Sequence, residues 1–132
     1  RGSGRFARVF SELSRGVATL RTERGSLWRD TVVVCVTEFG RTVWPNGSGG
    51  TDHGTAAAAF LFGGGIRGGR VVADWPGLAD RDLYEGRDLR PTLDVVAVLK
   101  GVLHEHLRLT ESQLAEVFPA HHAVAPQLGI LS

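Results

Sequence analysis

The sequence has little of several features that would point to a class of function. It contains one cysteine, Cys35, so no internal disulfide can form and the redox compartment stays open. No stretch approaches the roughly 20 apolar residues of a membrane span. The formal net charge is only +1, which gives no reason to expect nucleic acid or an anionic membrane as a partner.

Several common catalytic motifs are also missing. The glycine-rich stretch 63–69 lacks the Gly-Lys-Ser/Thr ending of a P-loop, and it leads to Val71 and Val72 rather than into a helix that could hold phosphate. There is no Gly-x-Ser-x-Gly elbow, and Cys35 lies in the middle of an apolar run. Neither a serine nor a cysteine nucleophile is therefore indicated.

Two amphipathic helices and two apolar runs give the chain its predicted architecture. Apolar residues repeat at helical spacing over 5–24, followed by Gly25 as a stop signal. The continuously apolar, β-branched run 31–37 is typical of a strand buried in a parallel sheet, and 56–62 is interpreted as a second strand. A further helix is predicted to begin after Thr92 as its N-cap.

The order of these elements predicts an α/β layered domain. A short helix over 110–117 is expected from Thr110 and Gln113, which have the spacing of a capping box. The segment 66–74 is expected to make a short β-excursion. Two or three strands cannot close a doubly wound sheet. We therefore expect residues 1–132 to be a partial single domain whose remaining strands lie in an N-terminal part.

Three side chains next to the predicted strands are candidate metal ligands. Glu38 directly follows the first buried strand, where open α/β sheets bind their ligands. Asp52 and His53 precede the second strand and supply carboxylate and imidazole donors for zinc or another divalent cation. The alternatives are that Glu38 pairs with Arg41 and that Asp52 and His53 belong to a loop hydrogen-bond network.

One tryptophan is kept as a candidate substrate contact. Trp44 lies in the loop between Glu38 and His53, whereas the other two tryptophans are interpreted as core or covering residues.

Five stretches, in order, make the sequence similar to the bacterial family catalogued as domain of unknown function 1501 (DUF1501). The resemblance covers residues of about 20 to about 119, and the ordered matches make it specific. It implies a bacterial protein exported to the periplasm or secreted, with its signal in the N-terminal part. The matching stretches are Val32–Thr42, Gly50–Gly54, Phe62–Gly69, Asp74–Leu78 and Arg90–Asp94.

That family in turn resembles the alkaline phosphatase superfamily, which includes sulfatases and phosphopentomutases. The resemblance implies the C-terminal part of a layered domain with a mostly parallel sheet flanked by helices. Superfamily members use one or two divalent metals to activate a Ser or Thr nucleophile. Carried over by motif, Glu38 and His53 are metal ligands, and Asp52 is a ligand or orients His53.

The sequence departs from the superfamily pattern at one position. Phe39 stands where a metal-binding histidine is expected, and phenylalanine cannot ligate a metal. This leaves the second of the two metal sites in doubt. The metal would be zinc, manganese or calcium, and the nucleophile would lie in the N-terminal part.

Two hypotheses follow from these residues. The first is an exported, metal-dependent hydrolase of phosphate or sulfate esters, acting on a small-molecule or glycan ester, in which Arg41 clamps the anionic group. The second is a non-catalytic binding or scaffold protein on the same fold, because fold does not fix function. A Ser or Thr nucleophile and further Asp or His ligands in the N-terminal part would favour the first hypothesis.

Overall fold

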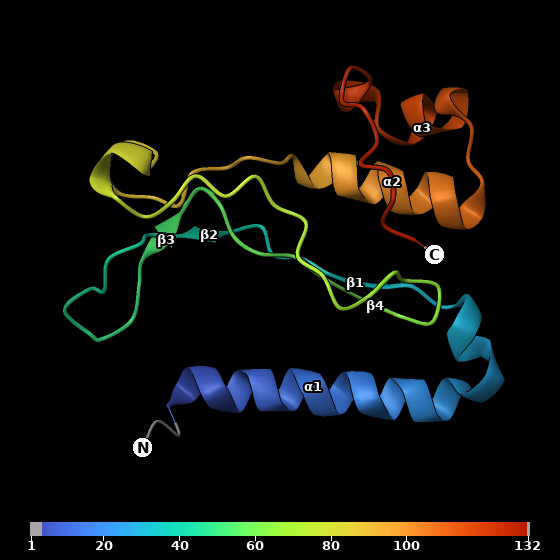
Figure 1. The fold of residues 1–132 in the computed structure, drawn as a ribbon, viewed down its shortest axis with the longest axis horizontal. Helices are drawn as coiled ribbons and strands as arrows, with labels where there is room; N and C mark the ends of the chain where they lie inside the picture. The colour runs from blue at the N-terminus through green and yellow to red at the C-terminus, as the bar shows by residue number, and fades with distance from the viewer. Residues whose placement is uncertain (1–3, 132) are drawn as a thin grey trace.

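The chain places one helix on each side of a small pair of strands. The computed structural model describes residues 4–131, apart from the side chain of Arg5. Figure 1 shows α1 on one side of the β1–β4 pair and α2 on the other. The elements are α1 (Arg5–Arg24), β1 (Val33–Cys35), β2 (Gly40–Arg41), β3 (His53–Gly54), β4 (Phe60–Phe62), α2 (Val95–Leu107) and α3 (Glu111–Val117), with short 3-10 helices at Gly25–Asp30, Asp80–Asp82 and Pro119–His121.

Helix α1 has the bounds that its apolar spacing predicts. It runs from Arg5 to Arg24 and ends at Gly25, whose φ of 52° belongs to the left-handed region. The Gly25 N–H donates to the carbonyls of Arg21 and Thr22, which satisfies two of the helix's last acceptors.

The described strands form two antiparallel pairs. In the first pair Val33 lies opposite Phe62 and Cys35 opposite Phe60. The second pair joins β2 to β3. The predicted mixture of helices and strands is confirmed, but residues 4–131 contain no parallel pair, so the mostly parallel sheet stays a prediction. The predicted excursion over 66–74 is reduced to an isolated bridge between Ile66 and Leu131.

The main core lies between α2 and one face of the β1–β4 pair. Because successive residues of a strand point to opposite faces, Val34 and Leu61 face α2 while the flanking residues face α1. The buried centre consists of Val98, Val102 and Ile130, packed against Val32, Val34, Leu61, Ile66 and Leu131.

Helix α2 begins later than predicted. Asp94, not Thr92, is the N-cap, and its carboxylate accepts a hydrogen bond of 2.8 Å from the N–H of Val96. The prediction of Thr92 was therefore wrong by two residues. By contrast, the capping box of Thr110 and Gln113 is present at the start of α3, as its spacing indicates.

Two charged side chains of α2 hold the C-terminal segment across the helix. The buried Lys100 ammonium donates to the carbonyls of His121 and Val124, at 2.6 and 2.8 Å. The Glu105 carboxylate accepts hydrogen bonds from three successive backbone N–H groups, those of residues 129–131. The segment thereby covers the core side of α2, and Ile130 becomes part of the core.

None of the helices in residues 4–131 combines the length and apolar character needed to cross a bilayer.

Candidate functional site

The β2–β3 pair brings the two predicted motifs together. Arg41 lies opposite His53 and Gly40 opposite Gly54 in this pair. The close approach requires glycine, because a Cβ added to Gly54 would lie 2.6 Å from the carbonyl carbon of Arg41. The small residues that flank the predicted ligands therefore let the two strands meet.

The side chain of Phe39 contacts His53 directly. The rings of Phe39 and His53 stack with centroids 4.3 Å apart and an interplanar angle of 5°. Both residues are exposed, as is Glu38, which directly precedes Phe39. Stacking of this kind contributes about 1 kcal/mol beyond buried area. Phe39 therefore orients the His53 ring, although it cannot supply a ligand.

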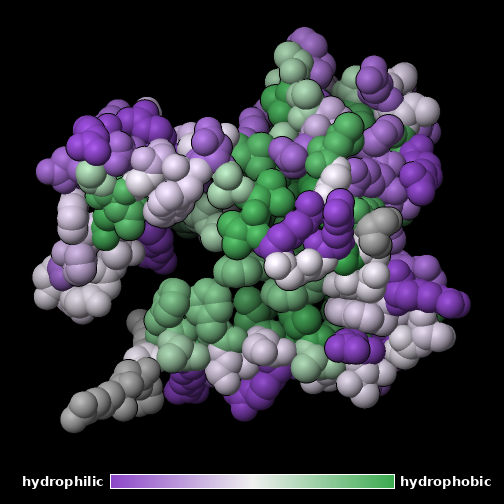
Figure 2. Space-filling view, in the orientation of Figure 1, coloured by the Kyte–Doolittle hydropathy of each residue, from purple (hydrophilic) through white to green (hydrophobic). Residues whose placement is uncertain are grey.

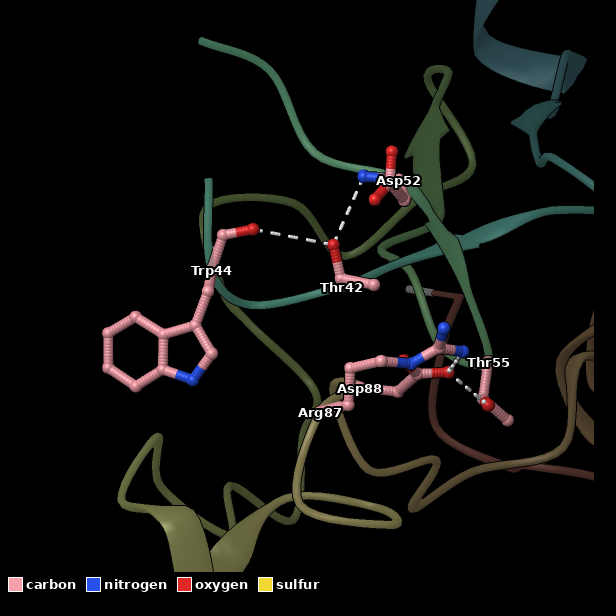
Figure 3. A network of polar contacts seen from close by, with 6 residues as sticks. All are labelled: Thr42, Trp44, Asp52, Thr55, Arg87 and Asp88. Carbon is pink, nitrogen blue, oxygen red and sulfur yellow. Dashed lines mark hydrogen bonds and ion pairs between the residues drawn. The ribbon is translucent and has the colours of Figure 1, made fainter. Parts of the chain in front are cut away.

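The loop between the two strands is ordered by its own polar side chains. Asn46 Nδ2 donates to Asp52 Oδ1 at 2.8 Å, and Asn46 Oδ1 accepts from the N–H groups of Ser48 and Gly50. The N–H of Asp52 donates to Thr42 Oγ1 at 3.1 Å (Figure 3). These hydrogen bonds confirm the loop network that was the alternative interpretation of Asp52. The Asn46 side chain contacts only one oxygen of the Asp52 carboxylate, Oδ1.

Arg41 and Trp44 both lie at the surface of this loop. The Arg41 guanidinium donates to the carbonyl of Thr51 at 3.0 Å, so part of it is used to hold the loop. Among the described residues Arg41 forms no ion pair with Glu38, so the alternative of a Glu38–Arg41 pair is not seen. Trp44 is 56% exposed, and Figure 3 shows its indole pointing away from Thr42 and Asp52.

The buried carboxylate of Asp88, which the sequence analysis did not single out, connects the residues that follow β2 and β3. Asp88 is 3% exposed, and its Oδ2 accepts a hydrogen bond of 2.8 Å from the hydroxyl of Thr55 (Figure 3). Its Oδ1 lies 2.8 Å from Arg87 Nε in an ion pair that lacks the alignment of a hydrogen bond. The Thr55 bond lowers the pKa of Asp88 most, burial raises it and Arg87 lowers it, so the pKa lies below its ordinary value.

The backbone around Asp88 also pairs with β2. Asp88 forms an isolated antiparallel bridge with Thr42, and the N–H of Val43 donates to the carbonyl of Arg87. Asp88 thus links Thr42, which directly follows β2, to Thr55, which directly follows β3. A turn at Glu85 and Gly86, both with positive φ, folds Asp88 back onto Tyr84. Gly86 is the sequence signal that could have indicated this turn.

The motifs that carry the predicted metal ligands meet through Phe39 and His53, and they do not form a complete metal site within the described residues. Glu38 is adjacent to the Phe39 ring that stacks on His53, and Asp52 precedes His53 in the chain. Nevertheless, no three His, Cys, Asp or Glu side chains within residues 4–131 gather closely enough to hold a metal ion. The described part of the chain therefore offers at most two such ligands at any one point.

Comparison with known proteins identifies a family but no characterised relative. The family model described as "Protein of unknown function (DUF1501)" matches residues 3–118. No curated protein and no solved structure matches the chain.

Proposed function

The chain belongs to the DUF1501 family, and from that premise we propose that it supplies part of the metal centre of an exported hydrolase of phosphate or sulfate esters. The observation that carries the proposal is the contact between the two motifs, the Phe39–His53 stack at 4.3 Å. The remaining ligands and the nucleophile would come from an N-terminal part of the same alkaline-phosphatase-like domain. Export would place the enzyme in the periplasm or outside a bacterium, where it meets a small-molecule or glycan ester.

The donor set fits a divalent metal in kind but not in number. Carboxylate and imidazole suit zinc and manganese, and carboxylate suits calcium. Glu38 and His53 are the proposed ligands, and Asp52, oriented by Asn46, is a ligand or holds His53. Because fewer than three donors gather in the described residues, the rest of the coordination sphere must be completed by other groups. When bound, the metal would polarise the ester or activate a hydroxyl nucleophile.

Arg41 is the proposed clamp for the anionic part of the ester. A guanidinium has five N–H donors in a planar fork, and Arg41 uses one nitrogen, Nη1, to donate to the Thr51 carbonyl. Its remaining donors can bind sulfate or phosphate oxygens in a bidentate manner. Tethering to the loop would also lower the entropy that Arg41 loses when it binds the anion.

The test is metal content of the full gene product, purified without chelator and measured by elemental mass spectrometry. We expect about one zinc, manganese or calcium per chain, lost in Glu38→Ala and His53→Ala. Matched controls are Glu116→Ala and His122→Ala, which are exposed at the other end of the molecule and should keep the metal. Hydrolysis of aryl phosphate and aryl sulfate esters should fall with metal content. No stoichiometric metal in the wild type would overturn the proposal.

The second candidate function is a non-catalytic binding or scaffold protein. It is favoured by one observation: Phe39 fills the position of a superfamily ligand and covers a face of the His53 ring. In that case the exposed rings of Phe39 and Trp44 would contact a partner. A metal-free wild type whose partner binding weakens in Phe39→Ala would establish this alternative.

A further inference from the structure

The strands that carry Arg41 and His53 are too short to keep these two side chains aligned by themselves. β2 and β3 have two residues each, and Arg41 lies opposite His53 in the pair. Two strands alone are marginally stable in water even at ordinary strand length. Contacts from outside the pair must therefore hold the proposed anion clamp opposite the proposed metal ligand.

The backbone of Arg41 is held from both edges of β2. Its N–H donates to the carbonyl of Ala56 at 3.0 Å, and its carbonyl accepts from the N–H of Leu89 at 3.4 Å. The next residue, Thr42, forms the antiparallel bridge with Asp88. β2 therefore lies between the chain of β3 on one edge and the segment that carries Asp88 on the other.

The chain that leaves β3 passes closely over β2 to reach that segment. Gly40 makes the close passage possible, because a Cβ added there would overlap the backbone nitrogen of Ala56. Thr55 then donates its hydroxyl to Asp88 Oδ2 at 2.8 Å (Figure 3). This hydrogen bond ties the end of β3 to a residue 33 positions further along the chain.

The Asp88 side chain is a fixed point in this arrangement. It is buried, whereas the side chains of Arg41, His53 and Thr55 are exposed. Its second oxygen, Oδ1, lies 2.8 Å from Arg87 Nε in an ion pair. Because each carboxylate oxygen has its own partner, the group cannot rotate without leaving a buried oxygen unpaired.

Both residues held by Asp88 are next to the proposed functional side chains. Thr42 directly follows Arg41, and Thr55 is two residues after His53. A displacement of either threonine would therefore shift the guanidinium relative to the imidazole. A metal ligand and an anion clamp must act on the same ester, so misplacement by about 1 Å already lowers the efficiency of such a site.

We propose that Asp88 is a positioning residue, which through Thr42 and Thr55 fixes the Arg41 guanidinium relative to the His53 imidazole. The inference rests on the proposed function, in which His53 binds the metal and Arg41 binds the anionic group of the ester. Asp88 touches neither ligand in this role and acts only through geometry. Partners that orient metal ligands from outside the coordination sphere typically change metal affinity by about 10- to 100-fold.

The experiment removes the hydroxyl of Thr55 from the full gene product. Thr55→Val is similar in shape to wild type but leaves Asp88 Oδ2 without its donor. We expect it to weaken zinc binding about tenfold, measured by competition with a chromophoric chelator. Thr55→Ser keeps the hydroxyl and should stay within about threefold of wild type. The matched control is Thr22→Val on α1, whose hydroxyl bonds to the Ala18 carbonyl of its own helix, and it should bind zinc as wild type does.

A purely structural role for Asp88 would give a different result. Thr55→Val would then melt at a lower temperature but bind zinc with wild-type affinity when it is measured well below that temperature. This outcome would overturn the positioning role and leave the proposed function standing.

The position of the His53 ring is read separately in the metal-free protein. The stacked Phe39 ring shifts the NMR signals of the His53 ring protons, and we expect these shifts to change in Thr55→Val and to return in Thr55→Ser. A wild type that binds no zinc would remove the proposed function, and these spectra would still test the positioning. Unchanged His53 signals in Thr55→Val would overturn it.

Discussion

At the scale of single residues, the site depends on a glycine that lets two short strands meet. Gly54→Ala would place a methyl group within 2.6 Å of the Arg41 backbone, which cannot move without breaking the β2–β3 pair. We expect a loss of about 1–3 kcal/mol in the free energy of unfolding. Gly50→Ala in the same loop is the control, since the nearest atom to its Cβ is 3.9 Å away. Urea unfolding of both variants checks this, and equal midpoints would contradict it.

Asp88 gives the protein an acid-sensitive contact. Because the folded pKa of Asp88 is lowered, its stabilising effect is complete above the unfolded pKa of about 3.9 and is lost as pH falls through the folded value. Asp88→Asn should therefore be less stable than wild type at pH 7, with the difference shrinking below about pH 4.

The measurement for Asp88 is the urea midpoint from pH 7 down to the acid limit of folding. Asp74→Asn, at an exposed position, should run parallel to wild type. Glu105 also has a lowered pKa and titrates in both proteins, so the difference between the curves isolates Asp88. A gap that is constant with pH would show that the Asp88 charge does not matter.

At the scale of elements, local signals predicted the helices better than the strands. The apolar spacing gave α1 its bounds, and the Thr110–Gln113 capping box is present in the structure. Both depend on residues within one or two turns. The α2 start was missed because Thr92 and Asp94 are both acceptable caps, and only the fold selects Asp94.

The strands and the site depend on contacts that are distant in sequence. The pairing of β1 with β4 crosses the whole 40–59 region, and the apolar run alone could not show that this pairing is antiparallel. The sequence predicted that the Glu38 and His53 motifs lie close together, because Glu38 follows one predicted strand and His53 precedes the next. The role of Asp88 was not predicted, because its partner Thr55 is 33 positions away.

The C-terminal segment supplies a prediction at this scale. Burial raises the pKa of Glu105, but the N–H groups of Leu131, Gly129 and Ile130, followed by the charge of His104, lower it more. Glu105→Gln keeps the shape and removes the charge, so we expect a loss of about 1–3 kcal/mol in the free energy of unfolding. Hydrogen exchange at 127–131 should become faster.

The control for this change is Glu116→Gln, an exposed carboxylate on α3. It should leave both the urea midpoint and the exchange of 127–131 unchanged. Unaltered exchange in Glu105→Gln would mean that the segment is held by Lys100 and by apolar packing of Ile130 instead.

At the scale of the whole molecule, the exposed apolar stripe of α1, which includes Phe6, Val9 and Leu20 (Figure 2), and the outer edges of β1 and β4 lead to a prediction for the 132-residue chain expressed alone. The outer edges of β1 and β4 and the stripe of α1 would then meet solvent, so the chain should bind a hydrophobic dye and associate as its concentration rises. A monomeric chain that melts cooperatively would contradict this expectation.

The effect of Val9→Asp then distinguishes an exposed helix surface from a covered one, because the substitution is expected to help the chain in one setting and destabilise it in the other. In the chain alone Val9 is 54% exposed, so Val9→Asp removes apolar surface from solvent and adds charge near the positive end of the α1 dipole. It should raise solubility and weaken association. In the full gene product the same change should lower the melting temperature, because there the aspartate is covered. Thr19→Asp should do neither by a comparable amount, since its side chain is on the outer face in both settings. Opposite signs at Val9 are expected only if other polypeptide covers α1, whereas the same sign in both proteins would mean that the stripe is ordinary surface.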